Sequence, residues 1–443
     1  MTVTTEAPKP LTPAWTQLRP HAGQAALWTC PKRFIAVPAG RGSGKTELAK
    51  RHLVRCLADR KPWPDPKYFY AAPTHLQAKR NAWQSLLALI PDDWISGGRF
   101  GRNVQYSELT VTTIFGSQLM IVGMDKPHRL EGCQFDGGVL DESCDYRSGV
   151  FDRTVLPMLT HRNGWCWRIG VPKRNGTSAK EYREFFERGI SGQDPEAAGY
   201  TWPSSDILPS EALRYAKENL DPKDYREQFE ASWETAGGRI FYAFDTEYNV
   251  RPCQRDARQP IIVGSDFNVD PMAWVLGHKT ENRLEWFDEI WLHDTNTQHA
   301  LDVLVSRYGD HAGGFQFYGD ATGRHRESSA SRSDYQQILG DPRFIAKGRT
   351  VHYLKQNPDP RDRFAACNAM FCNAAGDRRM FVDPRCKRLI DDLNDRHYRP
   401  GTREPEDKGD LGHVTDAMGY ACHRLFPIHA ALITSGSVGM FTR

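Results

Sequence analysis

The stretch Ala39-Gly-Arg-Gly-Ser-Gly-Lys-Thr46 decides the fold of the first half of this 443-residue chain. It follows an apolar run at Phe34–Val37 and precedes a run with helical character at Glu47–Leu57. A glycine-rich loop that joins a strand to a helix and ends in Lys-Thr is typical of phosphate binding. The backbone N–H groups of such a loop point inward around phosphate oxygens, and the helix start adds its dipole. The sequence therefore predicts a nucleotide site in a P-loop fold.

Each residue of this loop has an expected role. The Lys45 ammonium is predicted to contact the β- and γ-phosphates of ATP, and the Thr46 hydroxyl to bind Mg²⁺. Arg41 could reach the γ-phosphate as a stabilising cation, or could be a solvated loop residue. Ala39 replaces the first glycine of the common pattern, which is a mild departure. The remaining residues of the predicted cradle are Gly40, Gly42, Ser43 and Gly44.

A second motif, Gly137-Gly-Val-Leu-Asp-Glu142, is an apolar run that ends in two acids. Asp141 is predicted to hold Mg²⁺, directly or through water, and Glu142 to polarise the attacking water. Alone this run is weak evidence, because strand ends are often acidic, but it stands 95 positions after Thr46 and so favours an ATPase. Arg129, just before it, is a second candidate for the stabilising cation, in this case one supplied to a neighbouring subunit. Its alternative is a structural salt bridge.

From Phe34 to about residue 175, short apolar runs alternate with helical patterns, which predicts a largely parallel α/β sheet with flanking helices. The candidate strands are Phe34–Val37, Tyr68–Ala71, Leu109–Phe115, Leu119–Val122, Gly138–Leu140 and Trp167–Gly170. Residues 178–232 are polar and helix-rich, for example at Ser178–Arg188 and Asp224–Trp233, until Gly237-Gly238 breaks the pattern. We therefore expect a flexible arm at 1–20, an ATPase core at 21–180, and a helical subdomain and linker at 181–240.

A second α/β domain is expected at 241–430, followed by a tail at 431–443. Its candidate strands are Ile261–Phe267, Met272–His278, Leu284–Trp291 and Phe315–Gly319, the first three consecutive and antiparallel. Residues 321–335 form a Ser/Arg-rich loop, and helical segments are expected around 361–374, 384–396 and 413–425.

Three aspartates stand at informative positions of this second domain. Asp266 and Asp320 each end an apolar strand, and Asp416 lies on the helix His413–Leu425, whose apolar residues follow helical spacing. Two strand-end carboxylates and one from a packed helix can converge on one or two Mg²⁺ or Mn²⁺ ions, and such a pair supports phosphodiester hydrolysis. Each aspartate alone is also typical of a turn or cap. Asp270, Asp410 and Glu289 are nearby acids for which a loop or surface role is expected.

Net charge, cysteine content and hydrophobicity are compatible with these motifs but do not by themselves indicate a function. A net charge of +3 is weak evidence for a polyanionic partner, although Arg324, Arg326 and Arg332 lie in a loop that could grip DNA phosphates or be merely solvated. None of the ten cysteines forms a CxxC pair, so reduced thiols are expected. No apolar run approaches the length of about 18 residues that a membrane span needs. We find no apolar signal core at the N-terminus, so the expected compartment is the cytoplasm.

Taken together, these motifs resemble the large terminase subunit of tailed bacteriophages. Arg19-Pro-His-Ala-Gly-Gln24 is similar to the family's adenine-recognition segment, which implies that Gln24 reads adenine. Gly170-Val-Pro-Lys173 resembles its coupling motif, here Val171 and Pro172, although many members have Thr or Ser where Val171 stands. Asp266, Asp320 and Asp416 fall where the family's ribonuclease-H-like nuclease carries its metal ligands.

The resemblance implies an ATP-driven motor that threads double-stranded viral DNA through a portal protein into a procapsid. Its metal-dependent endonuclease is expected to cut concatemeric DNA at initiation and termination. A homo-oligomeric ring on the portal and a small terminase subunit are the implied partners, and no membrane is involved. The implied location is the host cytoplasm and, transiently, the procapsid portal, not the mature virion. Two alternatives stay open: another P-loop helicase or recombination nuclease, and a non-catalytic DNA- or portal-binding protein.

Overall fold

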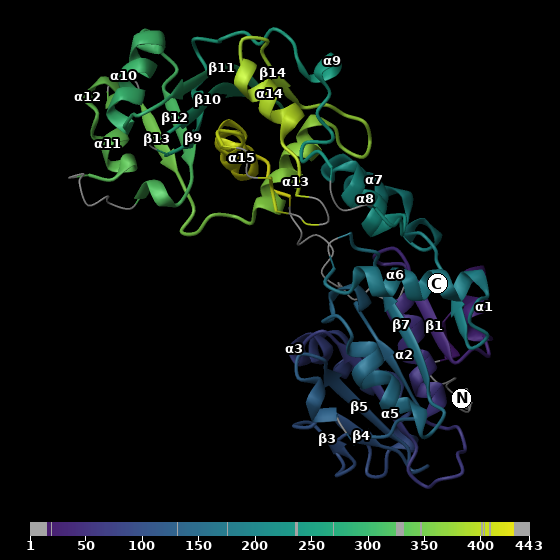
Figure 1. Ribbon diagram of the computed structural model, residues 1–443. Coiled ribbons are helices and arrows are strands. Elements are labelled where there is room, and N and C mark those ends of the chain that lie inside the picture. The colour runs from purple at the N-terminus through teal and green to yellow at the C-terminus, as the bar shows by residue number, and fades with distance from the viewer. Residues whose placement is uncertain are drawn as a thin grey trace, which may run out of the picture. The chain divides into compact units, whose positions relative to one another are not determined.

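The computed structural model divides into two compact units (Figure 1). It describes residues 16–18, 20–130, 132–174, 176–234, 238–268, 270–324, 332–345, 348–399, 402, 404–406 and 409–428, with the backbone alone at Arg129 and Ile345. The first unit comprises residues 1–210 and 226–235, and the second comprises 211–225 and 236–443. The predicted arm therefore lies mostly, and the tail entirely, outside the described residues, as do Arg326 and Gly237.

The described residues of the first unit build an eight-stranded sheet in the spatial order β3-β4-β5-β2-β6-β7-β1-β8. Its central strands are parallel, as the sequence predicts, while β3 and β4 form an antiparallel edge. The strands are β1 Phe34–Pro38, β2 Lys67–Ala72, β3 Val104–Gln105, β4 Thr110–Thr112, β5 Gln118–Gly123, β6 Gly137–Leu140, β7 Trp165–Gly170 and β8 Ala197–Gly199. The expected strand Leu109–Phe115 is shorter at both ends: Leu109 has a left-handed φ of 50°, and Gly116 N bonds to the Thr113 carbonyl oxygen in a turn after Thr112.

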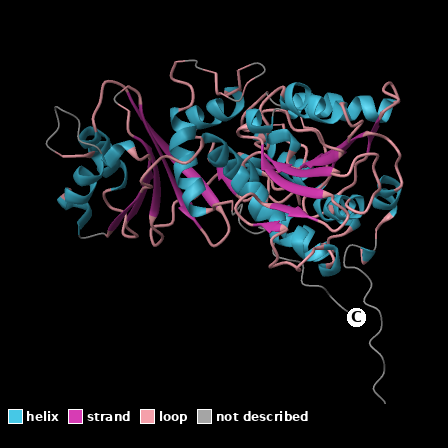
Figure 2. Cartoon of the chain, turned by 90° about the horizontal axis from the view of Figure 1, so that it is seen from below, coloured by secondary structure: helices cyan, strands magenta, loops and turns pink. Residues whose placement is uncertain are grey.

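Helices cover both faces of this sheet (Figure 2). Side chains alternate along β1, so that Ile35 and Val37 pack into one core, and Phe34 and Ala36 into the other. The main helices are α1 Ala22–Trp28, α2 Lys45–Cys56, α3 His75–Ala78, α4 Gln84–Leu89, α5 Leu156–Thr160 and α6 Ala179–Ser191, followed by α7 Ser210–Asn219 and α8 Pro222–Phe229. The helix expected over Asp224–Trp233 therefore ends earlier, close to Ala231, whose φ is 55°.

The second unit contains a six-stranded sheet in the order β13-β12-β9-β10-β11-β14. The three consecutive strands β9, β10 and β11 are antiparallel, as predicted, and β12 runs parallel to β9. The strands are β9 Ile261–Asp266, β10 Met272–Lys279, β11 Leu284–Leu292, β12 Phe315–Gly319, β13 Arg349–His352 and β14 Met380–Val382. Short β13 and β14 were not expected from the sequence, and each lies at an edge of the sheet.

Two helical layers enclose this second sheet. The helices are α9 Thr246–Asn249, α10 Thr297–Tyr308, α11 Asp334–Gly340, α12 Pro342–Ile345, α13 Pro360–Phe371, α14 Lys387–Asp395 and α15 His413–Leu425. Apolar residues of α13, α14 and α15 form one core with the sheet, whereas α10 and α11 contribute to the other. The helix α15 comes closest at Gly264 of β9, where a Cβ atom would lie 2.4 Å from the Ala417 carbonyl oxygen. Among the described residues, no helix has the length and apolar character that crossing a membrane requires.

Candidate functional site

The phosphate loop connects β1 to α2 at the carboxyl edge of the first sheet. Gly42 and Gly44 have left-handed φ values of 71° and 74°, a conformation that glycine adopts without steric cost. The buried Lys45 ammonium donates to the carbonyl oxygen of Gly40 at 3.2 Å. Burial lowers the pKa of Lys45 and outweighs the opposing charges of Glu142 and Asp141. The loop therefore holds a desolvated cation beside two carboxylates.

The acidic strand end meets this loop directly. The Thr46 hydroxyl donates to Asp141 Oδ2 at 3.0 Å, and the Tyr70 hydroxyl donates to the same oxygen at 2.5 Å. Burial raises the pKa of Asp141, and the neighbouring charge of Glu142 raises it further. Thus the two sequence motifs, 95 positions apart, meet in one cluster, with Tyr70 as a further partner that the sequence analysis did not single out.

Glu142 is held by a residue outside the predicted site. Lys173 donates to Glu142 Oε2 at 3.1 Å and also pairs with Asp145. Burial by itself would raise the pKa of Glu142, but the ammonium groups of Lys173 and Lys45 lower it below its ordinary value. The Glu142 backbone is left-handed, with φ 56° and ψ 48°, which is uncommon for a residue other than glycine.

The predicted coupling segment follows β7, the strand between β1 and β6. Ala39 N donates to the Gly170 carbonyl oxygen at 3.0 Å, and the Cys144 thiol donates to the Val171 carbonyl oxygen at 3.3 Å. Val171 and Pro172 are buried. The end of β7 is therefore bonded to the start of the phosphate loop, and Val171 is bonded to the loop that follows Glu142.

The remaining residues predicted for the nucleotide site differ in their placement. Gln24 on α1 is buried, and its Nε2 donates to the Ser43 carbonyl oxygen at 3.4 Å. The Trp202 indole donates to the same oxygen at 2.9 Å. The Arg41 charge acts on both Lys45 and Glu142 and lowers the pKa of each. The Arg129 side chain lies outside the described residues.

In the second unit, β9 and β12 are neighbouring parallel strands. Asp266 is the last residue of β9, and Asp320 directly follows β12. Both side chains are buried. Asn268 Nδ2 donates to Asp266 Oδ2 at 2.9 Å, and His413 Nδ1 lies 2.9 Å from the same oxygen. Burial raises the pKa of Asp266, and the charges of Asp416 and Asp320 raise it further. The charges of the other two aspartates therefore reach the Asp266 carboxyl group.

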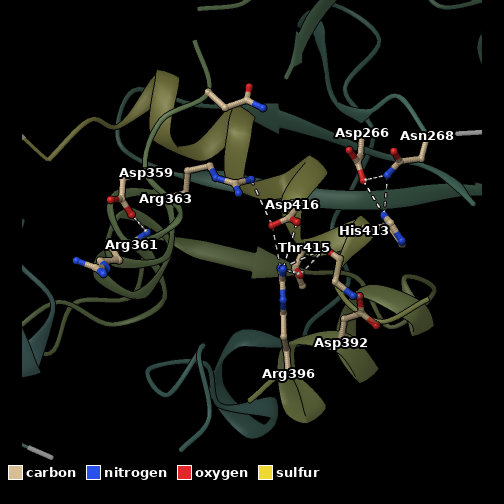
Figure 3. Close-up of polar contacts among 12 residues, drawn as sticks. Asp266, Asn268, Asp359, Arg361, Arg363, Asp392, Arg396, His413, Thr415 and Asp416 are labelled. Atoms are coloured by element: carbon tan, nitrogen blue, oxygen red, sulfur yellow. Dashed lines mark hydrogen bonds and ion pairs between the residues drawn. The ribbon is translucent and has the colours of Figure 1, made fainter. Parts of the chain in front are cut away.

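Asp416 has partners that the sequence analysis did not identify (Figure 3). Arg396 forms a two-pronged contact, Nη1 to Oδ1 at 2.9 Å and Nη2 to Oδ2 at 3.2 Å. Arg363 Nη1 lies 3.3 Å from Oδ1. Burial alone would raise the pKa of Asp416, but the two guanidinium groups hold it below its ordinary value.

The aspartates supply hard oxygen donors of the kind that Mg²⁺ and Mn²⁺ prefer. No group of three or more His, Cys, Asp or Glu side chains among the described residues has an arrangement that could hold a metal ion. Asp266 and Asp320 fit the role of ligands, whereas Asp416 is engaged by arginines in this structure. Of the nearby acids, Asp270 pairs with His293 at 2.6 Å, Glu289 accepts from the backbone at the start of α14, and Asp410 is exposed. Arg324 and Arg332 of the basic loop are exposed.

The fold and the two clusters define a two-part α/β protein: a P-loop NTPase sheet followed by a ribonuclease-H-like sheet. The same architecture is found in the large terminase of the thermophilic bacteriophage D6E, with a TM-score of 0.55 and 14% identity over 91% of this chain and 98% of that one. The ADP complex of that terminase gives a TM-score of 0.53 with 15% identity.

In sequence, the chain matches the large terminase subunits of Thermus phage G20c and Thermus virus P23-45, each 23% identical over 255 residues. The match covers 51% of this chain, and the chain spans about half (51%) of the length of each relative. No protein-family model matches the sequence. The predicted resemblance to large terminase subunits, and the predicted fold class, are confirmed by these comparisons.

Proposed function

We propose that this chain is the large subunit of a viral DNA-packaging terminase, an ATPase that moves double-stranded DNA and a nuclease that cuts it. The observation that carries the proposal is the 3.0 Å hydrogen bond between Thr46 and Asp141. It joins the end of the phosphate loop to the acidic strand end, so both halves of an ATP-hydrolysing site lie together. The likeness to large terminases in sequence and fold supports the choice of this class over other P-loop enzymes.

In the ATPase unit, Lys45 binds the β- and γ-phosphates within the cradle of Gly40, Gly42 and Gly44. Thr46 and Asp141 would hold Mg²⁺, which neutralises developing charge on the phosphates when it is bound. Glu142, kept ionised by Lys173, accepts a hydrogen bond from the attacking water and orients it. Arg41 supplies a stabilising cation from the same chain, with Arg129 as the alternative from a neighbouring copy. Gln24 recognises adenine, and Val171-Pro172 transmits the state of the site.

In the second unit, Asp266, Asp320 and Asp416 would hold one or two Mg²⁺ or Mn²⁺ ions. Such ions activate water and stabilise the leaving oxygen of a phosphodiester. His413 and Asn268 fix the Asp266 carboxylate, because both lie within hydrogen-bonding distance of Oδ2. Arg324 and Arg332, which are exposed, would attract the DNA backbone, and DNA binding would then depend on salt.

The partners of the proposed motor are double-stranded DNA, a portal protein, a small terminase subunit and further copies of this chain in a ring. A ring built from one repeated heterologous contact allows one subunit to supply an arginine to the next. The proposed location is the host cytoplasm and, during packaging, the portal of the procapsid.

A packaging assay tests this proposal. Purified chain, procapsids with portal, linear DNA and ATP are expected to yield DNA that is protected from added nuclease. The Lys45→Ala variant should give no protected DNA. Unwinding of duplex DNA by the wild-type chain, without protection, would favour a helicase instead, and absence of phosphate release would favour a non-catalytic binding protein.

A further inference from the structure

The aspartate cluster of the second unit contains two buried cations that have no role in the function proposed above. Arg396 and Arg363 are 7% and 5% exposed, and both contact Asp416. Arg396 directly follows α14, and Arg363 lies on α13. Two separate elements therefore place positive charges beside one carboxylate (Figure 3). Burying two guanidinium groups is costly unless each has partners.

Both terminal nitrogens of Arg396 donate hydrogen bonds. Besides its two bonds to Asp416, Nη1 donates to the Thr415 hydroxyl at 2.7 Å and to the Gly412 carbonyl oxygen at 3.2 Å. Arg363 is less well paired. Its Nε and Nη1 are buried without a hydrogen-bond partner among the described residues, although Nη1 lies in ion-pair range of Asp416. The guanidinium also lies 4.2 Å from the centre of the Tyr420 ring. Arg363 therefore keeps unused donors beside the cluster.

This arrangement has an electrostatic consequence. Both oxygens of Asp416 accept hydrogen bonds from Arg396, so a metal ion that uses Asp416 must compete with a guanidinium already in place. The two positive charges also repel an arriving cation. Buried donors that lack a partner are costly, so the unused donors of Arg363 are suited to an arriving anion, and a phosphodiester presents such oxygens.

We propose that Arg396 and Arg363 hold Asp416 away from the metal ions until a DNA phosphodiester replaces the carboxylate as the partner of these arginines. The two arginines are thus positioning residues that couple metal binding to DNA binding. Divalent metal binds weakly to the chain alone and tightly when DNA is present. This inference rests on the proposed nuclease function. It adds that the metal site of the aspartate cluster forms completely only when DNA is bound.

The test is a titration of the full chain with Mn²⁺. Binding to the aspartate cluster is defined as the Mn²⁺ binding that is lost in the Asp266→Asn variant. Without DNA, Arg396→Gln and Arg363→Gln should each bind Mn²⁺ at least about tenfold more tightly than the wild type, because a charge within about 4–6 Å shifts such equilibria by one or more powers of ten. Arg251→Gln is the matched control, because Arg251 pairs with Glu285 at 2.6 Å elsewhere in the same unit. It should leave the affinity unchanged.

A second titration adds a short DNA duplex and follows free Mn²⁺ by its electron paramagnetic resonance. DNA should tighten Mn²⁺ binding in the wild type, and tighten it less in Arg396→Gln. Should Arg396→Gln fail to fold, Arg363→Gln decides, because its only lost contact with Asp416 is the 3.3 Å ion pair.

The outcomes distinguish a failure of this inference from a failure of the proposed nuclease function. Unchanged or weaker binding in both variants, beside normal Asp266-dependent binding in the wild type, overturns the inference and leaves the nuclease centre intact. A complete lack of Mn²⁺ binding in every variant, with and without DNA, overturns both.

Discussion

Asp141 and Glu142 are adjacent in the chain and have the same charge, yet their surroundings shift their pKa values in opposite directions. Asp141 is buried beside another acid, so its pKa is raised. Glu142 is also buried, but Lys173 and Lys45 lower its pKa. The difference suits their proposed roles, since a carboxylate that orients water must stay ionised. Lys173 is the largest of the contributions that lower the pKa of Glu142.

Replacing Lys173 with Met should therefore move the acid limb of the ATPase pH profile to higher pH. The lysine lowers the pKa of Glu142, so its removal raises that pKa, and Glu142 is protonated over more of the acidic range. The loss of kcat should be larger at about pH 6 than at about pH 9. Steady-state phosphate release across pH measures this.

Lys180→Met is the control for this experiment, because Lys180 is an exposed lysine that pairs only loosely with Glu184, at 3.9 Å. Its profile should match the wild type. A uniform loss of kcat at every pH in Lys173→Met would contradict the role assigned to Lys173.

At the scale of elements, the second site depends on how closely α15 approaches β9. The helix presents Asp416 and the strand presents Asp266, and Gly264 lets the two elements meet. A methyl group there would lie 2.4 Å from the Ala417 oxygen and 2.9 Å from a Val275 methyl. Neither element can move without displacing a carboxylate.

The Gly264→Ala change should destabilise the second unit by about 1–3 kcal/mol, the usual cost of overpacking a core. It should also reduce DNA cleavage while ATP hydrolysis continues. Denaturant unfolding and parallel activity assays measure both effects. Gly419→Ala on α15 should have the opposite sign, because its nearest neighbour would be 3.7 Å away and alanine favours a helix. Equal effects from the two changes would exclude close packing as the cause.

The elements that the sequence predicts well are those with strong local patterns. The apolar runs Phe34–Val37 and Ile261–Phe267 identify inner strands of the two sheets, because both faces of such strands are buried. The short edge strands β8, β13 and β14 have no such signal. Likewise, Lys45, Thr46 and Asp141 follow from motifs, whereas the pairing of Arg396 with Asp416, 20 positions away, depends on tertiary packing. No spacing of residues in the sequence indicates that these two side chains pair.

At the scale of the whole molecule, each compact unit carries one of the two clusters. The phosphate loop, Asp141, Glu142 and Lys173 belong to the first unit, and the three aspartates with their arginines belong to the second. No residue of either cluster is shared between the units. The two proposed activities should therefore be separable by point mutation.

Lys45→Ala should abolish ATP hydrolysis and leave metal-dependent DNA cleavage, because it removes the only ammonium of the phosphate loop. Asp266→Ala should abolish cleavage and leave ATP hydrolysis. Phosphate release and nicking of plasmid DNA with Mg²⁺ or Mn²⁺, measured on the same preparations, provide the comparison. Wild-type turnover in Lys45→Ala would refute the nucleotide site, and loss of both activities in one folded variant would refute separability.

The left-handed backbone of Glu142 has a consequence for protein engineering. Such a conformation costs about 1–3 kcal/mol in a residue other than glycine, and Gly, Asn or Asp relieve much of it. A selection for thermostability alone should therefore favour replacement of Glu142, and the survivors should be robust proteins that no longer turn over ATP. The position is one where heat resistance and the proposed ATP hydrolysis select for different amino acids.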